Sequence, residues 1–318
     1  MLKNSHAEAP SQNNKNNSQG RLHGTWASRW TFILAATGSA VGLGNIWKFP
    51  YIAGENGGGA FVLVYIACIA IVALPIMVAE VTLGRMGRQS PINTIRNLIK
   101  ESGASKSFGV IGWMGVSAGL MILSYYSVIA GWALNYIEYM VSGVFQNVTA
   151  EQAGTIFDDL MKDKNELIFW QSLFMLMTVV VVMCGIHKGL GLASQILMPL
   201  LFLLLVGLLI FGYQQGDLTG AFNFLFGFNF GSLTWQSVLV ALGHAFFTLS
   251  IGMGAMMVYG AYMPSNTGIF SNVLMVGVLD TLVALIAGLV IFSIVFANPS
   301  IESSAGPGLM FVSLPVAF

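Results

Sequence analysis

Seven long apolar stretches, separated by polar segments, dominate the pattern of hydrophobic and polar positions along the chain. An α-helix needs about 20 mostly apolar residues to cross the hydrocarbon core of a bilayer, and each stretch meets or approaches that length. The pattern therefore predicts an all-α membrane protein with seven transmembrane helices. The expected boundaries are approximately 30–52, 59–83, 109–143, 167–185, 192–213, 235–262 and 271–297.

The two ends of the chain differ from these stretches. Residues 1–24 are rich in asparagine and serine and lack an apolar core, so they predict a disordered cytoplasmic tail and not a signal peptide. Residues 25–297 are expected to form the transmembrane domain, and residues 298–318 the start of an extracellular loop. Because the sequence stops inside this loop, we expect an incomplete copy of a longer protein, truncated after the seventh helix.

Basic residues indicate the orientation, because Lys and Arg concentrate in the cytoplasmic loops of membrane proteins. The segment between the third and fourth stretches is acidic, which suits the outside. Bases precede the first stretch and follow the second and the fourth. They are Arg21, Arg29, Arg85, Arg88, Arg96, Lys100, Lys106 and Lys188. This distribution predicts a multi-pass protein of the plasma (inner) membrane with a cytoplasmic N-terminus.

Composition narrows the class of function. Hydrophobic residues make up 56% of the chain and charged residues 8%, whereas soluble domains carry roughly 25% charged residues. The formal net charge of zero argues against a nucleic-acid partner. The sequence contains no CxxC, HExxH, P-loop or nucleophile-elbow motif. We therefore predict neither enzymatic activity nor an organic cofactor.

The first stretch contains an unusual concentration of glycine. Gly38, Gly42 and Gly44 lie within one short segment, and each glycine in a helix interior costs about 1 kcal/mol relative to alanine. Close packing of helices through small residues is one explanation. However, Asn45 and Lys48 follow at once, and polar side chains at this depth favour an unwound segment that faces a cavity.

The sixth stretch repeats this feature. Thr248, Ser250, Gly252 and Gly254 interrupt its apolar run with hydroxyl groups and glycines. Two interrupted helices, five apart in order, are typical of transporters built from two inverted repeats of five helices. The predicted fold is therefore the first part of a five-plus-five inverted-repeat transporter, with helices one and six broken.

Asp280 lies in the middle of the seventh stretch. An acid at this depth of a membrane indicates a functional site by default, and structural pairing is the alternative.

Several blocks of sequence, in order, resemble the neurotransmitter:sodium symporter family, and in particular its bacterial sodium-dependent amino-acid transporters. The run from Arg29 to Tyr51 resembles the first helix of that family, and the resemblance covers nearly everything after residue 25. It continues in residues 55–61, in Pro75, Glu80, Gly84 and Arg85, in Tyr125 and Tyr126, and in residues 246–250. Members of the family have further helices beyond the seventh, so the match covers the first repeat and the start of the second.

The resemblance implies two sodium sites. Oxygen ligands suit sodium because it is a hard cation. The second site would take its remaining ligands from an eighth helix that this chain lacks. The first site would be formed by Ala40, Asn45, Thr248 and Asp280, and the second by the carbonyl groups of Gly38 and Val41.

The resemblance also implies an amino-acid substrate. Its carboxylate would meet the backbone amides of Leu43 and Gly44 and the hydroxyl of Tyr126. Packing within the membrane is the alternative role for Tyr126, and also for two apolar residues of the expected pocket, Ile122 and Met253. The pocket would be lined by Ala40, Ile122, Phe247, Thr248, Ser250 and Met253.

Two gates are implied as well. Lys48 and Phe247 would close the outer side, where lysine replaces the more usual arginine and cannot form a bidentate pair. Trp26, Arg21 and Tyr262 would belong to the cytoplasmic gate, although Arg21 lies two residues before the usual position of its cation.

Together these patterns predict sodium-coupled symport of an amino acid by alternating access. Gly42 stands where relatives that carry monoamines have an aspartate, so the substrate is expected to supply its own carboxylate; a large apolar or aromatic side chain fits best. A non-transporting membrane sensor or regulatory remnant that keeps the fold is the alternative. Membrane lipid is an expected partner, and the sequence leaves homo-oligomerisation open.

Overall fold

The computed structural model describes residues 25–298 and 308–317. Within these residues the structure is built from helices and short connections and contains no strand. The predicted N-terminal tail, and residues 299–307 of the predicted loop, lie outside the described residues. The sequence predicted only a loop for the last residues of the chain. The structure instead has a π-helical turn there, Leu309–Ser313, followed by α14, Leu314–Ala317.

In the part of the chain that the structure describes, five uninterrupted helical segments are long and apolar enough to cross a membrane. They agree within a few residues with the second, third, fourth, fifth and seventh predicted stretches. Short π-helical turns join α3 to α4 and precede α9. The helices are α3 (Gly59–Cys68) continued by α4 (Leu74–Gly87), α6 (Gly109–Val141), α8 (Lys164–Met183), α9 (Leu192–Gln215) and α13 (Ile269–Ala297).

The first and sixth predicted stretches are each divided into short helices. The first contains α1 (Arg29–Ala40), a π-helical turn (Gly44–Lys48) and α2 (Phe49–Glu55). The sixth contains α11 (Trp235–Thr248) and α12 (Ala255–Ala261). None of these pieces reaches the roughly 20 residues that a bilayer requires, so no single one of them is long enough to cross a membrane.

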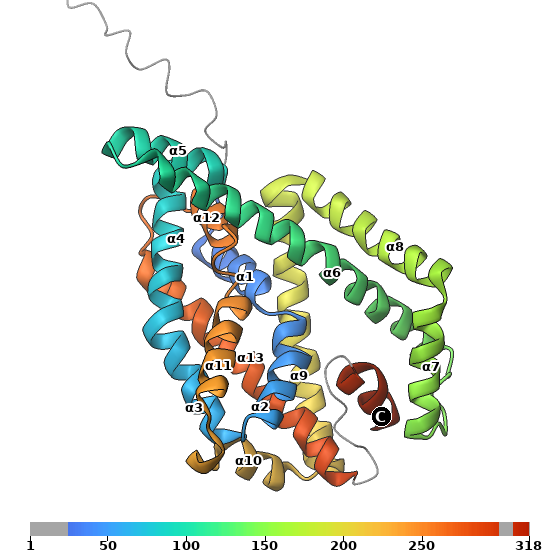
Figure 1. The fold of residues 1–318 in the computed structure, drawn as a ribbon. Helices are drawn as coiled ribbons and strands as arrows, with labels where there is room; N and C mark the ends of the chain where they lie inside the picture. Colours follow the sequence, from blue (N-terminus) through green and yellow to red (C-terminus); the bar gives the residue numbers. More distant parts are fainter. Residues whose placement is uncertain (1–24, 299–307, 318) are drawn as a thin grey trace, which may run out of the picture.

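Three further helices connect the long ones. They are α5 (Pro91–Ser102), α7 (Ala150–Lys162) and α10 (Leu218–Phe226). Thr149 and Gln152 form a capping box that starts α7. In Figure 1, α5 and α10 lie at opposite ends of the bundle.

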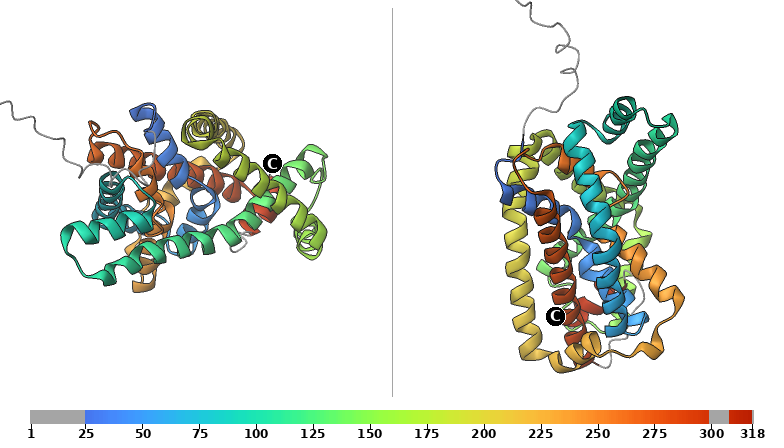
Figure 2. Two further views of the ribbon diagram at one scale, coloured as in Figure 1. Left: turned by 90° about the horizontal axis from the view of Figure 1, so that it is seen from above. Right: turned by 90° about the vertical axis from the view of Figure 1, so that its left-hand side faces the viewer.

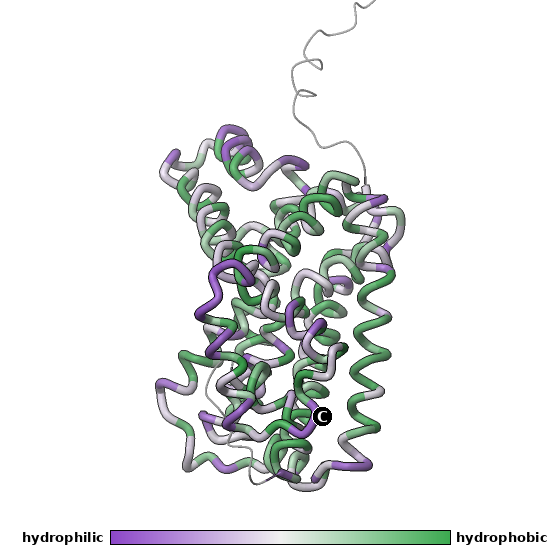
Figure 3. The backbone as a smooth tube through the Cα atoms, turned by 90° about the vertical axis from the view of Figure 1, so that its right-hand side faces the viewer, coloured by the Kyte–Doolittle hydropathy of each residue, from purple (hydrophilic) through white to green (hydrophobic). Residues whose placement is uncertain are grey.

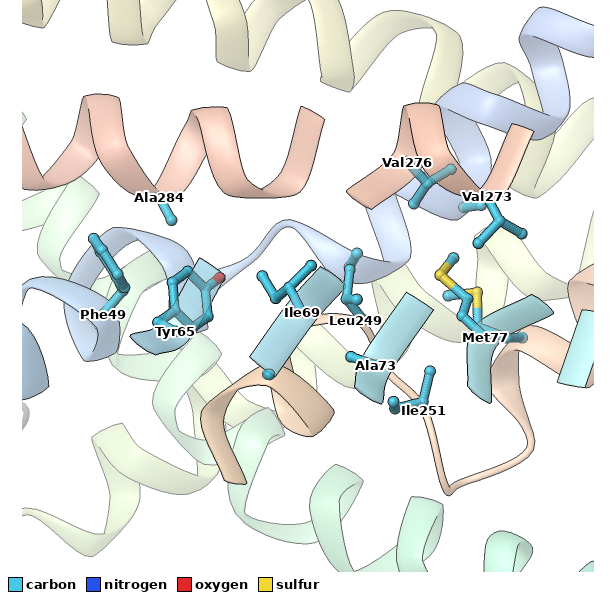
Figure 4. Close-up of a cluster of buried hydrophobic side chains, with 14 of the residues drawn as sticks. Phe49, Tyr65, Ile69, Ala73, Met77, Leu249, Ile251, Val273, Val276 and Ala284 are labelled. Atoms are coloured by element: carbon cyan, nitrogen blue, oxygen red, sulfur yellow. The ribbon is translucent and has the colours of Figure 1, made fainter. Parts of the chain in front are cut away.

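The core lies where the two divided helices meet α3, α4 and α13. Figure 4 shows side chains from all of these elements converging, among them Phe49, Tyr65, Leu249 and Val276. In contrast, α6, α8 and α9 run along the outside of the bundle in Figure 2 and present many exposed apolar side chains. Figure 3 shows hydrophobic residues dominating these long segments. Such surfaces are compatible with lipid or with further protein.

Helix α12 packs closely against α4 through glycines on both sides. A Cβ atom at Gly84 would collide with the backbone carbonyl of Met257, and one at Gly260 with that of Val81. The small residues let the two backbones approach, as at other helix interfaces in membranes. This contact fixes the second half of the sixth stretch against an uninterrupted helix.

We expect Gly84→Ala to destabilise the protein, because backbone atoms cannot move aside as the end of a side chain can. Overpacking of this kind costs about 1–3 kcal/mol. Gly207→Ala is the matched control, since a Cβ there would meet no heavy atom within 4 Å. Thermal unfolding of the purified protein in detergent should show a lower midpoint for Gly84→Ala alone. Equal midpoints for both variants would contradict the close packing.

Candidate functional site

The two interruptions lie side by side in the centre of the bundle. After α1 ends, Val41 adopts an extended conformation. In the sixth stretch, Ser250, Gly252 and Gly254 all have positive φ angles, of 53°, 86° and 75°. The Ser250 hydroxyl donates a 2.8 Å hydrogen bond to the Ser39 carbonyl. This bond joins the two interruptions directly.

A buried cluster of polar groups connects the first interruption to α13. The Asn45 amide nitrogen (Nδ2) lies 2.8 Å from Asp280 Oδ1 and 3.1 Å from Thr248 Oγ1. The Thr248 hydroxyl also lies 3.0 Å and 3.1 Å from the two carboxylate oxygens of Asp280. Asn45 and Asp280 are 0% exposed and Thr248 is 1% exposed. Three residues that the sequence assigned to one site are therefore in contact.

The chemistry of this cluster suits a single monovalent cation. Among the described residues the structure contains only one ion pair, Lys162 with Asp159 on α7, so Asp280 has no cationic side chain as partner. A buried carboxylate without a countercharge is costly. The described residues hold no group of three or more His, Cys, Asp or Glu side chains that would suit a transition metal. The carboxylate and the adjacent hydroxyl oxygen are ligands that sodium prefers, and the Asn45 Oδ1 atom, which accepts a 3.0 Å hydrogen bond from the Gly42 amide, is a further oxygen of the same side-chain amide.

A cavity of about 320 Å³ opens between the two interruptions and α6. It brings together Ala40, Gly44, Ile122, Tyr126, Phe247, Ser250 and Met253 of the predicted substrate residues. Its wall also contains residues that the sequence did not single out as substrate contacts. These are Gly38, Ser39, Val41, Gly119, Leu123 and Ala255.

Two predicted substrate residues lie beside this cavity and not on its wall. The Leu43 amide donates a 3.0 Å hydrogen bond to the Tyr126 hydroxyl, and Leu43 lines a smaller neighbouring cavity of about 120 Å³. Thr248 points away, toward Asp280. Gly42 makes the contact with Tyr126 feasible, because a Cβ atom there would lie only 2.5 Å from the hydroxyl.

The residues predicted for a second sodium site, Gly38 and Val41, lie at the end of α1 facing α9. They line a separate open groove of about 410 Å³ together with Ser194 and Met198. Few oxygen atoms face this groove from α9, since most of its remaining lining is leucine. The described residues therefore bring together only part of a cation site here.

The predicted gate residues occupy both sides of the cavity. Lys48 Nζ lies 4.2 Å from the centre of the Phe247 ring, within the range of a cation–π contact. On the side of α12, the buried Trp26 ring stacks on Tyr259 at 5.7 Å and meets Tyr262 edge-on at 6.3 Å. The Trp26 indole also donates a 3.0 Å hydrogen bond to the Tyr259 carbonyl. Arg21 lies outside the described residues.

The sequence interpretation gave no role to Glu80, which the structure places at the second interruption. Its carboxylate accepts a 2.6 Å hydrogen bond from the Gly252 amide, one of the backbone groups that the broken helix leaves free. The sequence did contain a signal for Glu80, because an acidic residue within an apolar helix indicates a functional site. Near the polar cluster, the rings of His244 and Tyr65 pack at a tilt, with their centroids 5.3 Å apart.

Comparison with known proteins identifies relatives of this chain. A family model described as the sodium:neurotransmitter symporter family matches residues 23–152 and 161–318. An uncharacterized sodium-dependent transporter of Bacillus subtilis is 39% identical over 92% of the chain, and one of Haemophilus influenzae is 33% identical over 92%. The crystal structure of MhsT in complex with L-phenylalanine superposes with a TM-score of 0.84, at 43% identity over 93% of the chain.

The chain spans just under two thirds of each relative: 64% and 65% of the two bacterial transporters and 66% of the MhsT chain. The family is one of sodium-dependent transporters and not of enzymes. The residues that the family model matches include those of both divided helices and of α13. Thus, this chain belongs to the sodium:neurotransmitter symporter family.

Proposed function

We propose that the protein containing this chain is a symporter that couples the entry of sodium to the entry of an amino acid across the plasma membrane. The observation that carries the proposal is the contact of Asn45, Thr248 and Asp280 at the junction of two divided helices. Such junctions near the middle of the bilayer are where transporters of this architecture hold ions and substrates.

In the proposed first sodium site, the cation replaces the hydrogen bonds that the Asn45 amide donates to Thr248 and Asp280. The negative charge of Asp280 attracts it strongly because the site is fully buried. The Ala40 carbonyl, at the end of α1, supplies a further oxygen. A second sodium ion is proposed at the carbonyls of Gly38 and Val41, which line the groove facing α9.

The proposed substrate is an amino acid in the cavity of about 320 Å³. Its carboxylate would lie near the amides of Leu43 and Gly44 and the Tyr126 hydroxyl, where the start of the π-helical turn favours an anion. Ile122, Phe247, Ser250 and Met253 would surround the side chain. The bound L-phenylalanine of MhsT supports an apolar or aromatic substrate.

For the membrane arrangement, we propose seven crossings in residues 25–297, with the divided helices counted as the first and sixth. In Figure 1, α5, which carries Arg96 and Lys100, lies at the end of the bundle opposite α10, which supports a cytoplasmic placement of that end. Alternating access would move the divided helices relative to the uninterrupted ones. Because the Ser250 hydroxyl donates a hydrogen bond to the Ser39 carbonyl, a movement of one interruption on sodium binding would also move the other.

Uptake of radiolabelled phenylalanine into cells or vesicles tests the proposal. We expect accumulation in sodium medium at least tenfold above that in choline medium, because the carboxylate of Asp280 needs a small cation that choline cannot replace. Equal uptake in both media would refute the coupling. Sodium-dependent binding without accumulation would instead identify a sensor that keeps the fold.

A further inference from the structure

A basic groove lies at the end of the bundle opposite α10, between α5 and the start of α6. Ile92, Arg96, Ile99 and Lys100 recur at helical spacing and so share one face of α5. Lys106, Gly109 and Trp113 form the other side, and the enclosed volume is about 590 Å³. None of these residues belongs to the proposed transport site.

The shape of the groove is fixed by close packing at its base. A Cβ atom at Gly112 would lie 2.9 Å from the Ile92 Cα atom, so glycine lets α5 approach the backbone of α6. Gly109 lies at the bottom, where a Cβ would be 4.0 Å from the Ile99 side chain. The groove is thus built by two helices and not by flexible side chains alone.

The charges of the groove have no countercharge. Arg96, Lys100 and Lys106 make no ion pair within the part of the chain that the structure describes. By contrast, Arg85 and Arg88 donate hydrogen bonds to the backbone carbonyls of Thr267 and Met263. The acid on this part of α5 is Glu101, which is adjacent to Lys100 in sequence and therefore points about 100° away around the helix.

The start of α6 and the turn before it also carry exposed apolar side chains. Trp113 and Met114 on α6 are 62% and 64% exposed, and Phe108 and Val110 are exposed as well. Tryptophan is typical of the boundary between headgroups and acyl chains. A single ligand that binds both the basic groove and the exposed apolar side chains needs a negative headgroup and a hydrocarbon chain.

We propose that this groove binds a phospholipid with a net negative headgroup from the cytoplasmic leaflet. The phosphate lies among Arg96, Lys100 and Lys106, and an acyl chain lies against Trp113 and Met114. Charge complementarity favours this occupant over a zwitterionic lipid, because clusters of Lys and Arg beside the membrane attract anionic headgroups. A free phosphate would leave the apolar side uncovered. The proposal depends on the membrane orientation but not on which substrate is transported.

Native mass spectrometry of the purified protein tests the assignment. Titration with phosphatidylglycerol and phosphatidylcholine should show tighter binding of the former. Arg96→Gln with Lys100→Gln should weaken it by about fivefold for each charge removed. Lys162→Gln with Lys164→Gln, at the end of α7 and the start of α8, removes the same number of charges outside the groove and should leave binding unchanged. Equal affinity for the two lipids, or equal losses in the two double variants, would overturn the proposal.

Tryptophan fluorescence gives a second, independent measurement in nanodiscs. Phosphatidylglycerol with brominated acyl chains should quench the emission component that Trp113→Phe removes, and excess inorganic phosphate should not relieve this quenching. Relief by phosphate would assign the groove to the free ion. Absence of quenching at Trp113 would show that protein, such as additional helices of a longer chain, covers the surface. Either result would refute the lipid site.

Discussion

Replacing Asp280 with asparagine is expected to weaken sodium binding by about 100-fold or more. At an effective dielectric constant near 20, two unit charges 4 Å apart attract by about 4 kcal/mol, and each 1.4 kcal/mol is a factor of ten in affinity. Asp280 is fully buried and has no cationic side-chain partner among the described residues. No positively charged side chain there therefore competes with sodium for the carboxylate. The asparagine side chain keeps the shape and loses the charge.

The same substitution should change the response to chloride. With Asp280 present, a fixed negative charge already balances the cation, and we expect transport to be indifferent to replacement of chloride by gluconate. With asparagine present, an added anion should partly restore the lost affinity. Sodium titrations of substrate binding in both anions measure the two effects together.

Asp217→Asn provides the matched control for this experiment. Asp217 caps the start of α10, where its side chain accepts a 2.8 Å hydrogen bond from the Gly220 amide. Asparagine caps helices about as well as aspartate, so this variant loses one charge without losing the cap. Unchanged sodium affinity and an unchanged chloride response in Asp280→Asn would contradict the proposed site.

Substitution of Gly42 by alanine should lower substrate affinity by roughly 5- to 150-fold, which corresponds to about 1–3 kcal/mol of overpacking. The new Cβ atom would lie 2.5 Å from the Tyr126 hydroxyl, which must then move. That hydroxyl accepts the hydrogen bond of the Leu43 amide, so its displacement disturbs the proposed carboxylate site. Both thermal stability and substrate binding should fall.

A double variant separates this steric effect from other causes. In Gly42→Ala with Tyr126→Phe the colliding oxygen is absent, and the next ring atom would lie 3.8 Å from the Cβ. Thermal stability should then recover toward that of Tyr126→Phe alone. Gly243→Ala on α11, where a Cβ meets nothing within 4 Å, should leave stability and binding intact. A double variant no more stable than Gly42→Ala would show that the contact with Tyr126 is not the cause.

Much of the fold could be predicted from local sequence because the bilayer restricts the choices. Long apolar runs such as residues 192–213 must be helical there, since no water is available to hydrogen-bond the backbone. The divisions at Gly42 and Gly252 also follow from local chemistry, because glycine beside polar residues weakens a helix. The role of Asp280 as a buried acid could be anticipated for the same reason.

Other features depend on segments that are far apart in the sequence. Contact between Asn45, Thr248 and Asp280 requires three separate helices to meet, and their spacing along the chain does not encode these distances. Two further features likewise form only when the helices pack. They are the hydrogen bond that the Gly252 amide donates to Glu80 and the groove between α5 and α6. The sequence by itself determined which segments form apolar helices and where two of them break, because those properties depend on neighbouring residues. Only the tertiary structure decided which side chains share a site, because that depends on how close the helix backbones can approach, as they do at Gly84 and Gly112.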